Sequence, residues 1–258
     1  MRFHGKKRII RSSKIQGIQK GRSTMNMERK YQIDTAQNSD FLKKARNELL
    51  SFWHKFPSPK GSSYYLGDDG TPWKTQNRET WITSRMAHVY CLGSFLSHPG
   101  SKELASAAIK GLCGELHDDK NGGWYAGLTA DGSILPNKQC YAHAFVILAA
   151  SSGVLAGIDQ ADALLQDALA IYDKYFWNET EGLSCDTWNT EFTKLDDYRG
   201  LNANMHTVEA FLSAADVIGD EKYRMRAGRI IDHVIGWVDE NDWRIPEHFT
   251  SSWEADLE

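Results

Sequence analysis

Polar side chains that could bind and protonate a small ligand lie within an otherwise apolar segment at residues 202–212. Asn202, His206 and Glu209 are separated by four and three residues. In a helix this spacing places them on one face, where they can share hydrogen bonds. Histidine suits acid or base chemistry near neutral pH without a metal or a redox cofactor.

The apolar segment at residues 81–90 contributes a cation and an aromatic ring. Arg85 can bind a hydroxyl, a carboxylate or a sulfonate through two parallel hydrogen bonds. Trp81 lies one helical turn earlier and offers a flat face to C–H groups. A row of directional donors beside an aromatic face suits a carbohydrate, so these two segments predict a sugar-binding cavity.

Each of these side chains also has a structural interpretation. A single buried histidine is usually a hydrogen-bonded core residue, which is the interpretation we favour for His88 and His143. Arg85 can instead pair with a buried carboxylate such as Glu209. His248 follows a Pro-Glu pair on a predicted loop, where it can face a cavity or pack against the loop end. Four tryptophans are expected in the core: Trp124, Trp177, Trp188 and Trp237.

The polar groups belong to apolar segments that recur at an interval of about sixty residues: 81–90, 141–149 and 202–212. Amphipathic segments alternate with them at a similar interval: 40–56, 101–117, 159–177 and 220–238. We expect an inner layer of apolar helices, whose polar groups point to a common axis, and an outer layer of amphipathic helices. Ser101, Asp159 and Asp220 stand where helix N-caps would lie.

Irregular stretches separate the two kinds of helix at residues 121–127, 181–185 and 241–248. Glycines or turn-forming residues flank an aromatic or aliphatic pair in these stretches, which favours short hairpins across one end of the helical layers. Functional loops of a helical ring would lie at that end. Ordinary connecting loops remain the alternative interpretation.

The composition is that of one large helical domain. The chain has 258 residues, of which 41% are hydrophobic and 25% charged, and its net charge is -4. No apolar run approaches the length of a membrane span, and the mild acidity gives no reason to expect a nucleic-acid partner. The cysteines lack CxxC spacing, which argues against a zinc site and fits a reducing, cytoplasmic location: Cys91, Cys113, Cys140 and Cys185.

Residues 1–30 differ from the rest, with ten Lys or Arg residues against the single acid Glu28. The segment lacks the apolar core of a secretion signal and the clean amphipathic period of an organelle signal. We therefore expect a disordered leader at 1–30, with non-native upstream sequence or a targeting peptide as alternatives, and one helical domain at 31–258.

Four motifs in order carry a resemblance to a known family: 81–90 (WITSRMAHVY), 138–145 (KQCYAHAF), 198–210 (YRGLNANMHTVEA) and 244–249 (RIPEHF). Together they resemble the N-acylglucosamine 2-epimerase superfamily. Within it, the chain is most similar to the aldose-ketose isomerases that include sulfoquinovose isomerase and mannose isomerase. The resemblance covers about residues 40 to 258.

The resemblance implies an all-α fold, an (α/α)6 barrel of six inner and six outer helices. Six units of about sixty residues need about 360 residues, so we expect an incomplete barrel with about four of the six helical hairpins. The family's main acid and base histidines lie in a Gly-His-x-x-Glu-Trp helix and near the chain end. Neither motif occurs here, so the expectation is that this chain alone has little or no isomerase activity.

The implied reaction is proton transfer at C2 of a monosaccharide through a cis-enediol, which interconverts an aldose with its ketose or 2-epimer. The resemblance makes His206 and His248 catalytic candidates. It makes these residues substrate-binding candidates: Trp81, Arg85, Tyr141, Asn202 and Glu209. No metal, cofactor, nucleic acid or membrane partner is expected, and the oligomeric state is open.

Two other functions stay open at this point. The same toroid is used by glycoside hydrolases, which need two carboxylates in the site, whereas Glu209 is the one plausible acid on the apolar segments. The second alternative is a helical interaction module or a nonfunctional fragment, whose first and last inner helices would expose apolar flanks.

Overall fold

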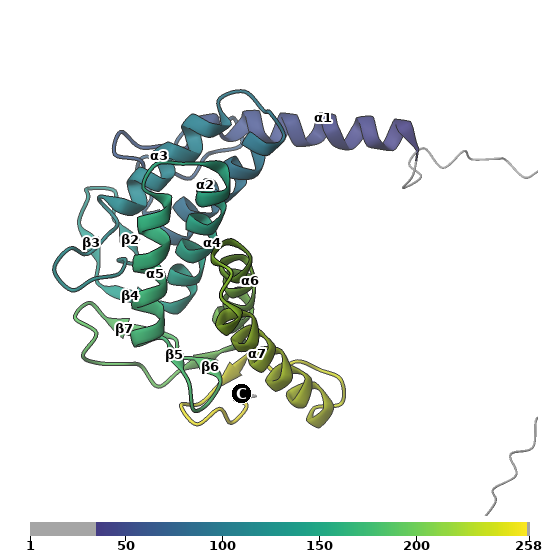
Figure 1. The fold of residues 1–258 in the computed structure, drawn as a ribbon. Helices are drawn as coiled ribbons and strands as arrows, with labels where there is room; N and C mark the ends of the chain where they lie inside the picture. Colours follow the sequence, from purple (N-terminus) through teal and green to yellow (C-terminus); the bar gives the residue numbers. More distant parts are fainter. Residues whose placement is uncertain (1–34, 257–258) are drawn as a thin grey trace, which may run out of the picture. The chain divides into compact units, whose positions relative to one another are not determined.

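The computed structural model describes residues 35–256, and its long elements are helices (Figure 1). The α-helices are α1 (Ala36–Phe52), α2 (Thr80–Phe95), α3 (Ser101–Cys113), α4 (Cys140–Ala156), α5 (Ala161–Tyr175), α6 (Leu201–Ile218) and α7 (Glu221–Glu240). A 3-10 turn, η1 (Trp53–Lys55), follows α1. The predicted all-α class is confirmed. The basic leader predicted at 1–30 lies outside the described residues.

The chain divides into two compact units, residues 1–43 and 44–258, so the boundary falls within α1. Of the first unit, the structure describes residues 35–43, which form the first half of that helix. The second unit contains the rest of α1 and every later element. The following description concerns this second unit.

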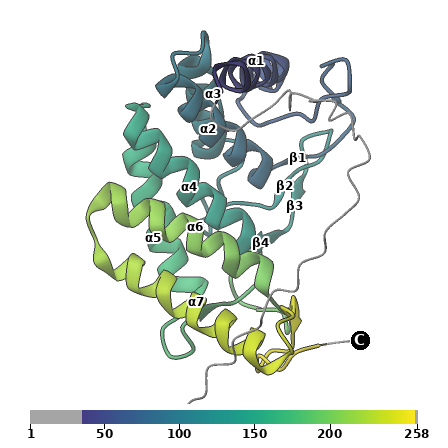
Figure 2. The ribbon, with the colours of Figure 1, turned by 90° about the vertical axis from the view of Figure 1, so that its right-hand side faces the viewer.

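Helices α2, α4 and α6 form one layer, in which α4 packs against both of the others (Figure 2). Each is followed by a helix that packs against it: α3 on α2, α5 on α4 and α7 on α6. Helix α4 is buried along almost its whole length, whereas α7 buries Tyr223, Ala227 and Ile230 on one face. A helix that is apolar all round lies inside and an amphipathic one lies outside. The predicted inner and outer layers are therefore confirmed.

Nine short strands lie among the described helices, and three of them lead directly into the inner helices. Strand β1 (Arg78–Glu79) precedes α2 and pairs with β2 (Gly127–Leu128), which also pairs with β3 (Ile134–Leu135). Strand β4 (Asn137–Gln139) precedes α4 and pairs with β7 (Thr187–Asn189). Strand β8 (Arg199–Gly200) precedes α6 and pairs with β9 (His248–Phe249). All these pairs are antiparallel, and they fix the points at which the inner helices begin.

The predicted hairpins are confirmed in part. Strands β5 (Trp177–Asn178) and β6 (Leu183–Ser184) form a local hairpin around residues 181–182. The stretch 121–127 leads into β2, which pairs with the nearby β3 and also with β1, far away in the sequence. The stretch 241–248 leads into β9, whose partner β8 is distant in the sequence. A local pattern of turn residues cannot specify such distant pairing.

One of the three predicted N-caps is confirmed. The Asp220 carboxylate accepts a hydrogen bond of 2.9 Å from the Lys222 backbone N–H at the start of α7. Helix α5 is capped by Gln160, so the prediction for Asp159 is wrong. The prediction for Ser101 is also wrong, because Gly100 is the cap residue and Ser101 is the first residue of α3.

The error at Ser101 has a steric cause. Gly100 has a φ of 76°, which turns the chain sharply before α3. The Ser101 side chain then packs against Gly93 of α2, where a Cβ would lie only 2.6 Å from its Oγ. This hydroxyl is buried and has no hydrogen-bond partner among the described residues. The cap position of α3 is therefore set by the tight turn rather than by a side-chain bond.

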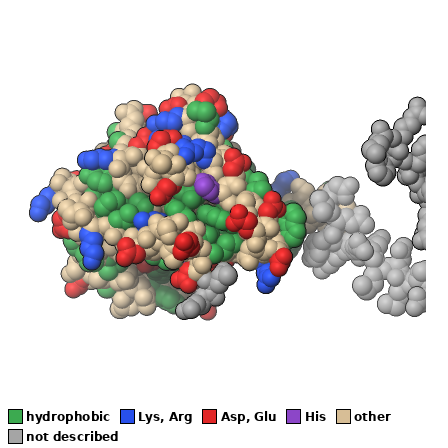
Figure 3. All heavy atoms as spheres, turned by 90° about the horizontal axis from the view of Figure 1, so that it is seen from below, with side chains coloured by type: hydrophobic (Ala, Val, Ile, Leu, Met, Phe, Trp, Pro, Cys, Tyr) green, Lys and Arg blue, Asp and Glu red, His purple; other side chains and the backbone are tan. Residues whose placement is uncertain are grey.

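None of the helices within residues 35–256 has the length and apolar character that crossing a bilayer requires. The face drawn in Figure 3 carries Asp, Glu, Lys and Arg side chains with hydrophobic side chains between them. The four cysteines are present as free thiols.

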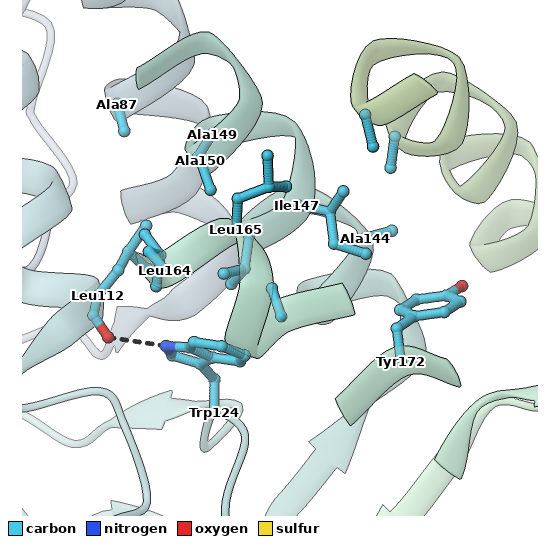
Figure 4. Packing of buried hydrophobic residues seen from close by; sticks show 14 of the residues in the cluster. Ala87, Leu112, Trp124, Ala144, Ile147, Ala149, Ala150, Leu164, Leu165 and Tyr172 are labelled. Atoms are coloured by element: carbon cyan, nitrogen blue, oxygen red, sulfur yellow. Dashed lines mark hydrogen bonds between the residues drawn. The ribbon is translucent and has the colours of Figure 1, made fainter. Parts of the chain in front are cut away.

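The core lies between the inner and outer helices (Figure 4). Trp124 is fully buried in it and donates an indole hydrogen bond of 2.7 Å to the Leu112 carbonyl oxygen. Trp177 is also buried, and Trp188 and Trp237 pack against the core, as predicted. Glycines at 122 and 123 have positive φ values of 82° and 69° and allow the turn that brings Trp124 inward.

A buried ion pair supports the same turn. The Lys138 ammonium lies 2.8 Å from Asp118 and donates a second hydrogen bond, of 2.7 Å, to the Gly122 carbonyl oxygen. Both side chains are almost completely shielded from solvent. A buried charge is tolerated when it is paired and hydrogen-bonded, and here the pair joins β4 to the loop before Trp124.

His143 and His88 have the structural roles predicted for them. The His143 ring is fully buried, lies 2.7 Å from the Gln139 carbonyl oxygen through Nδ1, and accepts the Trp124 backbone N–H at 3.1 Å through Nε2. Nδ1 therefore carries the proton, and burial lowers the pKa of this histidine to about 3. His88 pairs with Ser152 at 2.7 Å, and burial lowers its pKa as well.

Candidate functional site

A cavity of about 390 Å³ lies where the inner helices begin. Four segments line it, each next to a junction between a short strand and a helix or loop: Glu79 and Trp81; Gln139 and Tyr141; Asp186 and Thr187; Tyr198, Gly200, Asn202 and Ala203. Helix N-termini carry partial positive charge and N–H donors. Such a cavity suits a small ligand that is rich in oxygen atoms.

Equivalent positions of the three inner helices line this cavity. Trp81, Tyr141 and Asn202 are each the second residue of their helix, in α2, α4 and α6. All three are cavity-lining residues. The repeat seen in the sequence therefore corresponds to equivalent positions in the structure. At these positions the indole of Trp81, the phenol of Tyr141 and the amide of Asn202 line one cavity.

The sixth residues of the same helices form a second layer behind the cavity. The Arg85 guanidinium lies 4.4 Å from the Phe145 ring centroid, and the His206 ring lies 4.5 Å from the same centroid. Arg85 also lies 5.0 Å from the Trp81 ring and donates a hydrogen bond of 3.0 Å to the Tyr141 hydroxyl. Cation–π contacts of this kind hold a guanidinium flat against aromatic rings.

Arg85 is not paired with Glu209, so the structural alternative raised for it is wrong: its hydrogen bond among the described residues goes to Tyr141. The guanidinium lies at the edge of a separate apolar groove of about 350 Å³, beside Ile82, Met86 and Val89 of the same helix. It reaches the cavity through Tyr141.

His206 is oriented by a carboxylate and by aromatic rings. Its Nδ1 lies 3.0 Å from Glu209 Oε2, and its ring centroid lies 5.1 Å from that of Tyr141. The carboxylate accepts the Nδ1 proton, which leaves Nε2 without a partner among the described residues. Asn202 takes no part in this hydrogen bond, so the predicted network contains His206 and Glu209 alone.

His248 lies in an adjoining cavity of about 350 Å³, which it lines with Glu247, Met205 and others. Tyr198 and Asn202 line both cavities. The His248 Nδ1 lies 2.8 Å from the Tyr198 hydroxyl, and its ring is exposed. His248 therefore lines this adjoining cavity, and its catalytic role stays a prediction. Within residues 35–256, no group of three or more His, Cys, Asp or Glu side chains is arranged to hold a metal ion.

The sequence profile of the N-acylglucosamine 2-epimerase (GlcNAc 2-epimerase) family matches residues 61–258. The chain belongs to this family. A D-mannose isomerase of Thermobifida fusca is 37% identical over 222 residues, which are 85% of this chain and 54% of that protein. A D-mannose isomerase of Pseudomonas cannabina pv. alisalensis is 40% identical over 176 residues, which are 68% of this chain and 42% of that protein. The chain thus spans about half the length of these relatives.

Solved structures of sugar-converting enzymes have the same fold. A crystal structure of D-mannose isomerase superposes with a TM-score of 0.77 at 26% identity, over 84% of this chain and 56% of that one. Cellobiose 2-epimerase from Bacillus thermoamylovorans superposes with a TM-score of 0.74 over 84% of this chain and 61% of that one, and at 21% identity it supports the fold alone. The predicted (α/α)6-type fold is confirmed. The incompleteness of the barrel stays a prediction.

Several cavity residues of this family member were missed in the sequence. Glu79 and Gln139 are the residues just before α2 and α4, and Glu79 accepts a short hydrogen bond from the Tyr65 hydroxyl. The inner-helix repeat could have revealed both, since they precede the equivalent residues Trp81 and Tyr141 by two. Asp186 lies in a loop outside the periodic segments and gave no such signal.

Proposed function

We propose that this chain carries one side of the monosaccharide site of an aldose-ketose isomerase, with D-mannose as its sugar. The cavity at the inner-helix N-termini, lined by Trp81, Tyr141 and Asn202, is the observation that carries the proposal. The two D-mannose isomerases at 37% and 40% identity favour this function over a glycoside hydrolase or an interaction module. Sulfoquinovose is the anionic alternative, because a guanidinium such as that of Arg85 can pair with a sulfonate.

The geometry suits the binding half of a cis-enediol mechanism. Asn202 offers amide donors and an acceptor to the sugar oxygens, and Trp81 offers a ring face to its C–H groups. Arg85 stabilises negative charge that develops on a sugar oxygen during proton transfer at C2. His206, whose Nδ1 is held by Glu209, presents Nε2 as a proton acceptor that assists opening of the sugar ring.

Binding is the decisive measurement, because low turnover by this chain is itself a prediction. Isothermal titration calorimetry with D-mannose and D-fructose is expected to give saturable binding. Asn202→Ala removes the amide from the cavity, and affinity is expected to fall about tenfold, the value of about one good hydrogen bond. Asn77→Ala is the matched control, since Asn77 is an exposed residue outside this cavity.

Two outcomes would contradict the proposal. One is the absence of saturable binding for either sugar by a folded protein. The other is equal loss of affinity in the Asn202→Ala and Asn77→Ala variants, which would show that the cavity is not where the sugar binds.

A further inference from the structure

The first N–H of every inner helix is bonded in the same way. Thr80 of α2 donates to the Ala126 carbonyl oxygen at 3.0 Å, and Cys140 of α4 donates to that of Asp186 at 2.8 Å. Leu201 of α6 donates to the carbonyl oxygen of Glu247 at 3.0 Å. These three acceptors each precede a strand, β2, β7 or β9. They are therefore equivalent positions of the repeat.

Two of these equivalent positions carry a carboxylate, and both carboxylates line a cavity. Asp186 lines the cavity that contains Trp81 and Tyr141, and Glu247 lines the adjoining one with His248. The hydrogen bond from the helix N–H to its carbonyl oxygen fixes the backbone of Asp186 and of Glu247. Their carboxylates therefore lie near the N-termini of the inner helices. Of the two, Asp186 lies outside the four sequence motifs, whereas Glu247 belongs to the motif at 244–249.

Asp186 is held more firmly than Glu247. Its Oδ2 accepts a hydrogen bond of 2.6 Å from the Gly200 backbone N–H, the residue just before α6. Its carbonyl oxygen accepts the Cys140 N–H of α4. One residue therefore joins the starts of two inner helices. Its second carboxylate oxygen, Oδ1, accepts no hydrogen bond from residues 35–256, although a carboxylate can accept several.

Within residues 35–256, no cation forms an ion pair with this carboxylate. The nearest guanidinium, that of Arg199, donates to the carbonyl oxygens of Asp196 and Tyr198 at 2.9 and 2.7 Å. Ionisable groups that interact with Asp186 from the neighbouring segments are Asp196, Arg199, Tyr198, Cys140 and Cys185. Two more ionisable groups, Glu79 and Tyr141, line the same cavity. The pKa of Asp186 is raised to about 7: burial is the main cause and Asp196 adds to the rise, while the Gly200 N–H and Arg199 oppose it.

We propose that Asp186 is a sugar-contacting residue of this cavity, whose free oxygen Oδ1 accepts hydrogen bonds from hydroxyl groups of the bound monosaccharide. The inference rests on the proposed function and adds an acidic contact to it. Bonds to an ionised acceptor are stronger than those to a neutral one. Sugar binding therefore favours the ionised form of Asp186, and affinity for D-mannose is expected to rise from pH 6 to pH 8.

Asp186→Asn tests the contact in the full chain. The amide oxygen can still accept the Gly200 N–H, so the cavity wall is retained, while the charge is lost. We expect D-mannose affinity at pH 8 to fall about tenfold and its dependence on pH to flatten. Asp197→Asn is the control, because Asp197 is an exposed neighbouring carboxylate that does not line the cavity. It should bind D-mannose as the unmodified chain does.

A second measurement needs no variant and covers the case in which Asp186→Asn does not fold. Calorimetry of D-mannose binding at pH 7, in two buffers of different ionisation enthalpy, should show release of up to about half a proton, since the carboxyl is then about half protonated. Binding without proton release would overturn the inference. So would an Asp186→Asn variant with the affinity and pH profile of the unmodified chain.

These outcomes separate the inference from the proposed function. If the chain binds D-mannose and Asn202→Ala weakens binding while Asp186→Asn does not, the acidic contact is wrong and the sugar site stands. If the folded chain binds no sugar at any pH, both are wrong.

Discussion

Phe145 supports both polar groups behind the cavity, although its chemistry gave no sign of this in the sequence. The Arg85 guanidinium and the His206 imidazole lie 4.4 and 4.5 Å from the centroid of its ring. A single buried aromatic ring thus sets the orientation of a cation and of an acid–base group. Arg85 and His206 are thus both supported by Phe145, and no ion pair links Arg85 to Glu209, the carboxylate that is bonded to His206.

Phe145→Leu should therefore weaken sugar binding beyond its effect on stability. Leucine keeps most of the apolar volume but cannot form the cation–π contact or the ring contact with His206. We expect a loss of about 1–2 kcal/mol in the free energy of unfolding and a fall in D-mannose affinity. Phe192→Leu is the control, because Phe192 is also buried but stacks on Tyr175. Equal affinities of the two variants, measured by calorimetry, would contradict the role of Phe145.

The buried pair of Lys138 and Asp118 predicts a dependence of stability on pH. Burial alone would raise the pKa of Asp118, but hydrogen bonds from Lys138 and Asn121 hold it below the ordinary range. A lowered pKa in the folded state means that this carboxylate stabilises the fold above its unfolded pKa of about 4 and loses that contribution as the pH falls.

Lys138→Met should destabilise the protein by about 3–5 kcal/mol at pH 7, because it leaves a buried carboxylate without its cation. Protonation of Asp118 relieves this cost, so the difference from the unmodified chain should shrink as the pH falls toward 4. Urea unfolding at pH 7 and pH 4 measures both values. A difference that is constant or larger at pH 4 would show that the pair does not carry this stabilisation.

The residues that line the cavity were only partly predictable. Trp81 and Asn202 were singled out because they lie in periodic apolar segments, whereas Tyr141 was named through the family resemblance. Asp186 is placed by strand pairing between distant segments, which no local pattern specifies. The Asn202 side chain was wrongly assigned to the hydrogen bond between His206 and Glu209 for another reason. Residues that share a helix face need not be in contact.

At the level of elements, the starts of the inner helices were predicted more closely than their ends. The observed starts at Thr80, Cys140 and Leu201 lie one residue before the predicted ones. The observed ends lie five to seven residues beyond 90, 149 and 212. Small and polar residues in the last turns, such as Gly93 and Gly153, hid the continuation. They are tolerated there because Ser101 and Ala161 pack against them.

Ser101 and Asp220, two of the three positions predicted as caps, should respond differently to substitution by alanine. Asp220→Ala removes the hydrogen bond to the Lys222 N–H and should cost about 1 kcal/mol. Ser101→Ala removes a buried hydroxyl that has no partner among the described residues, so it should be neutral or stabilising. Thermal unfolding of both variants measures the contrast. A loss at Ser101 as large as that at Asp220 would mean that Ser101 does cap α3.

A close contact between a loop and α3 predicts a strong effect at Gly111. A Cβ on Gly111 would lie 2.5 Å from the carbonyl carbon of Gly61, whose own φ is 105°. Gly111→Ala should therefore cost about 1–3 kcal/mol through overpacking. Gly228→Ala in α7 meets no atom within 4 Å and should stabilise by up to about 1 kcal/mol through helix propensity. Urea unfolding that ranked the two variants in the opposite order would contradict the loop contact.

At the level of the whole molecule, the inner layer exposes apolar side chains that a monomeric protein usually covers. On α2 they follow one another at helical spacing: Val89, Leu92, Phe95 and Leu96. Others lie on α4 and α6: Leu155, Met205, Leu212 and Ile218. The groove beside Ile82 and Met86 continues the apolar face of α2 toward its N-terminus. Exposed apolar side chains at this spacing favour association.

The purified chain is therefore expected to associate as its concentration rises, and the α2 face should contribute. Leu92 and Phe95 are 44% and 52% exposed, so charges placed there disturb little of the core. The double substitution Leu92→Glu and Phe95→Glu should shift sedimentation velocity profiles toward the monomer, because burying two carboxylates in an interface is costly.

Ile134→Glu is the control, since Ile134 is similarly exposed, at 45%, on the short strand β3. A chain that sediments as a monomer at every concentration would contradict the expectation, as would an equal shift in the control. An effect specific to α2 would show that the inner-helix layer, rather than exposed apolar surface in general, drives the association.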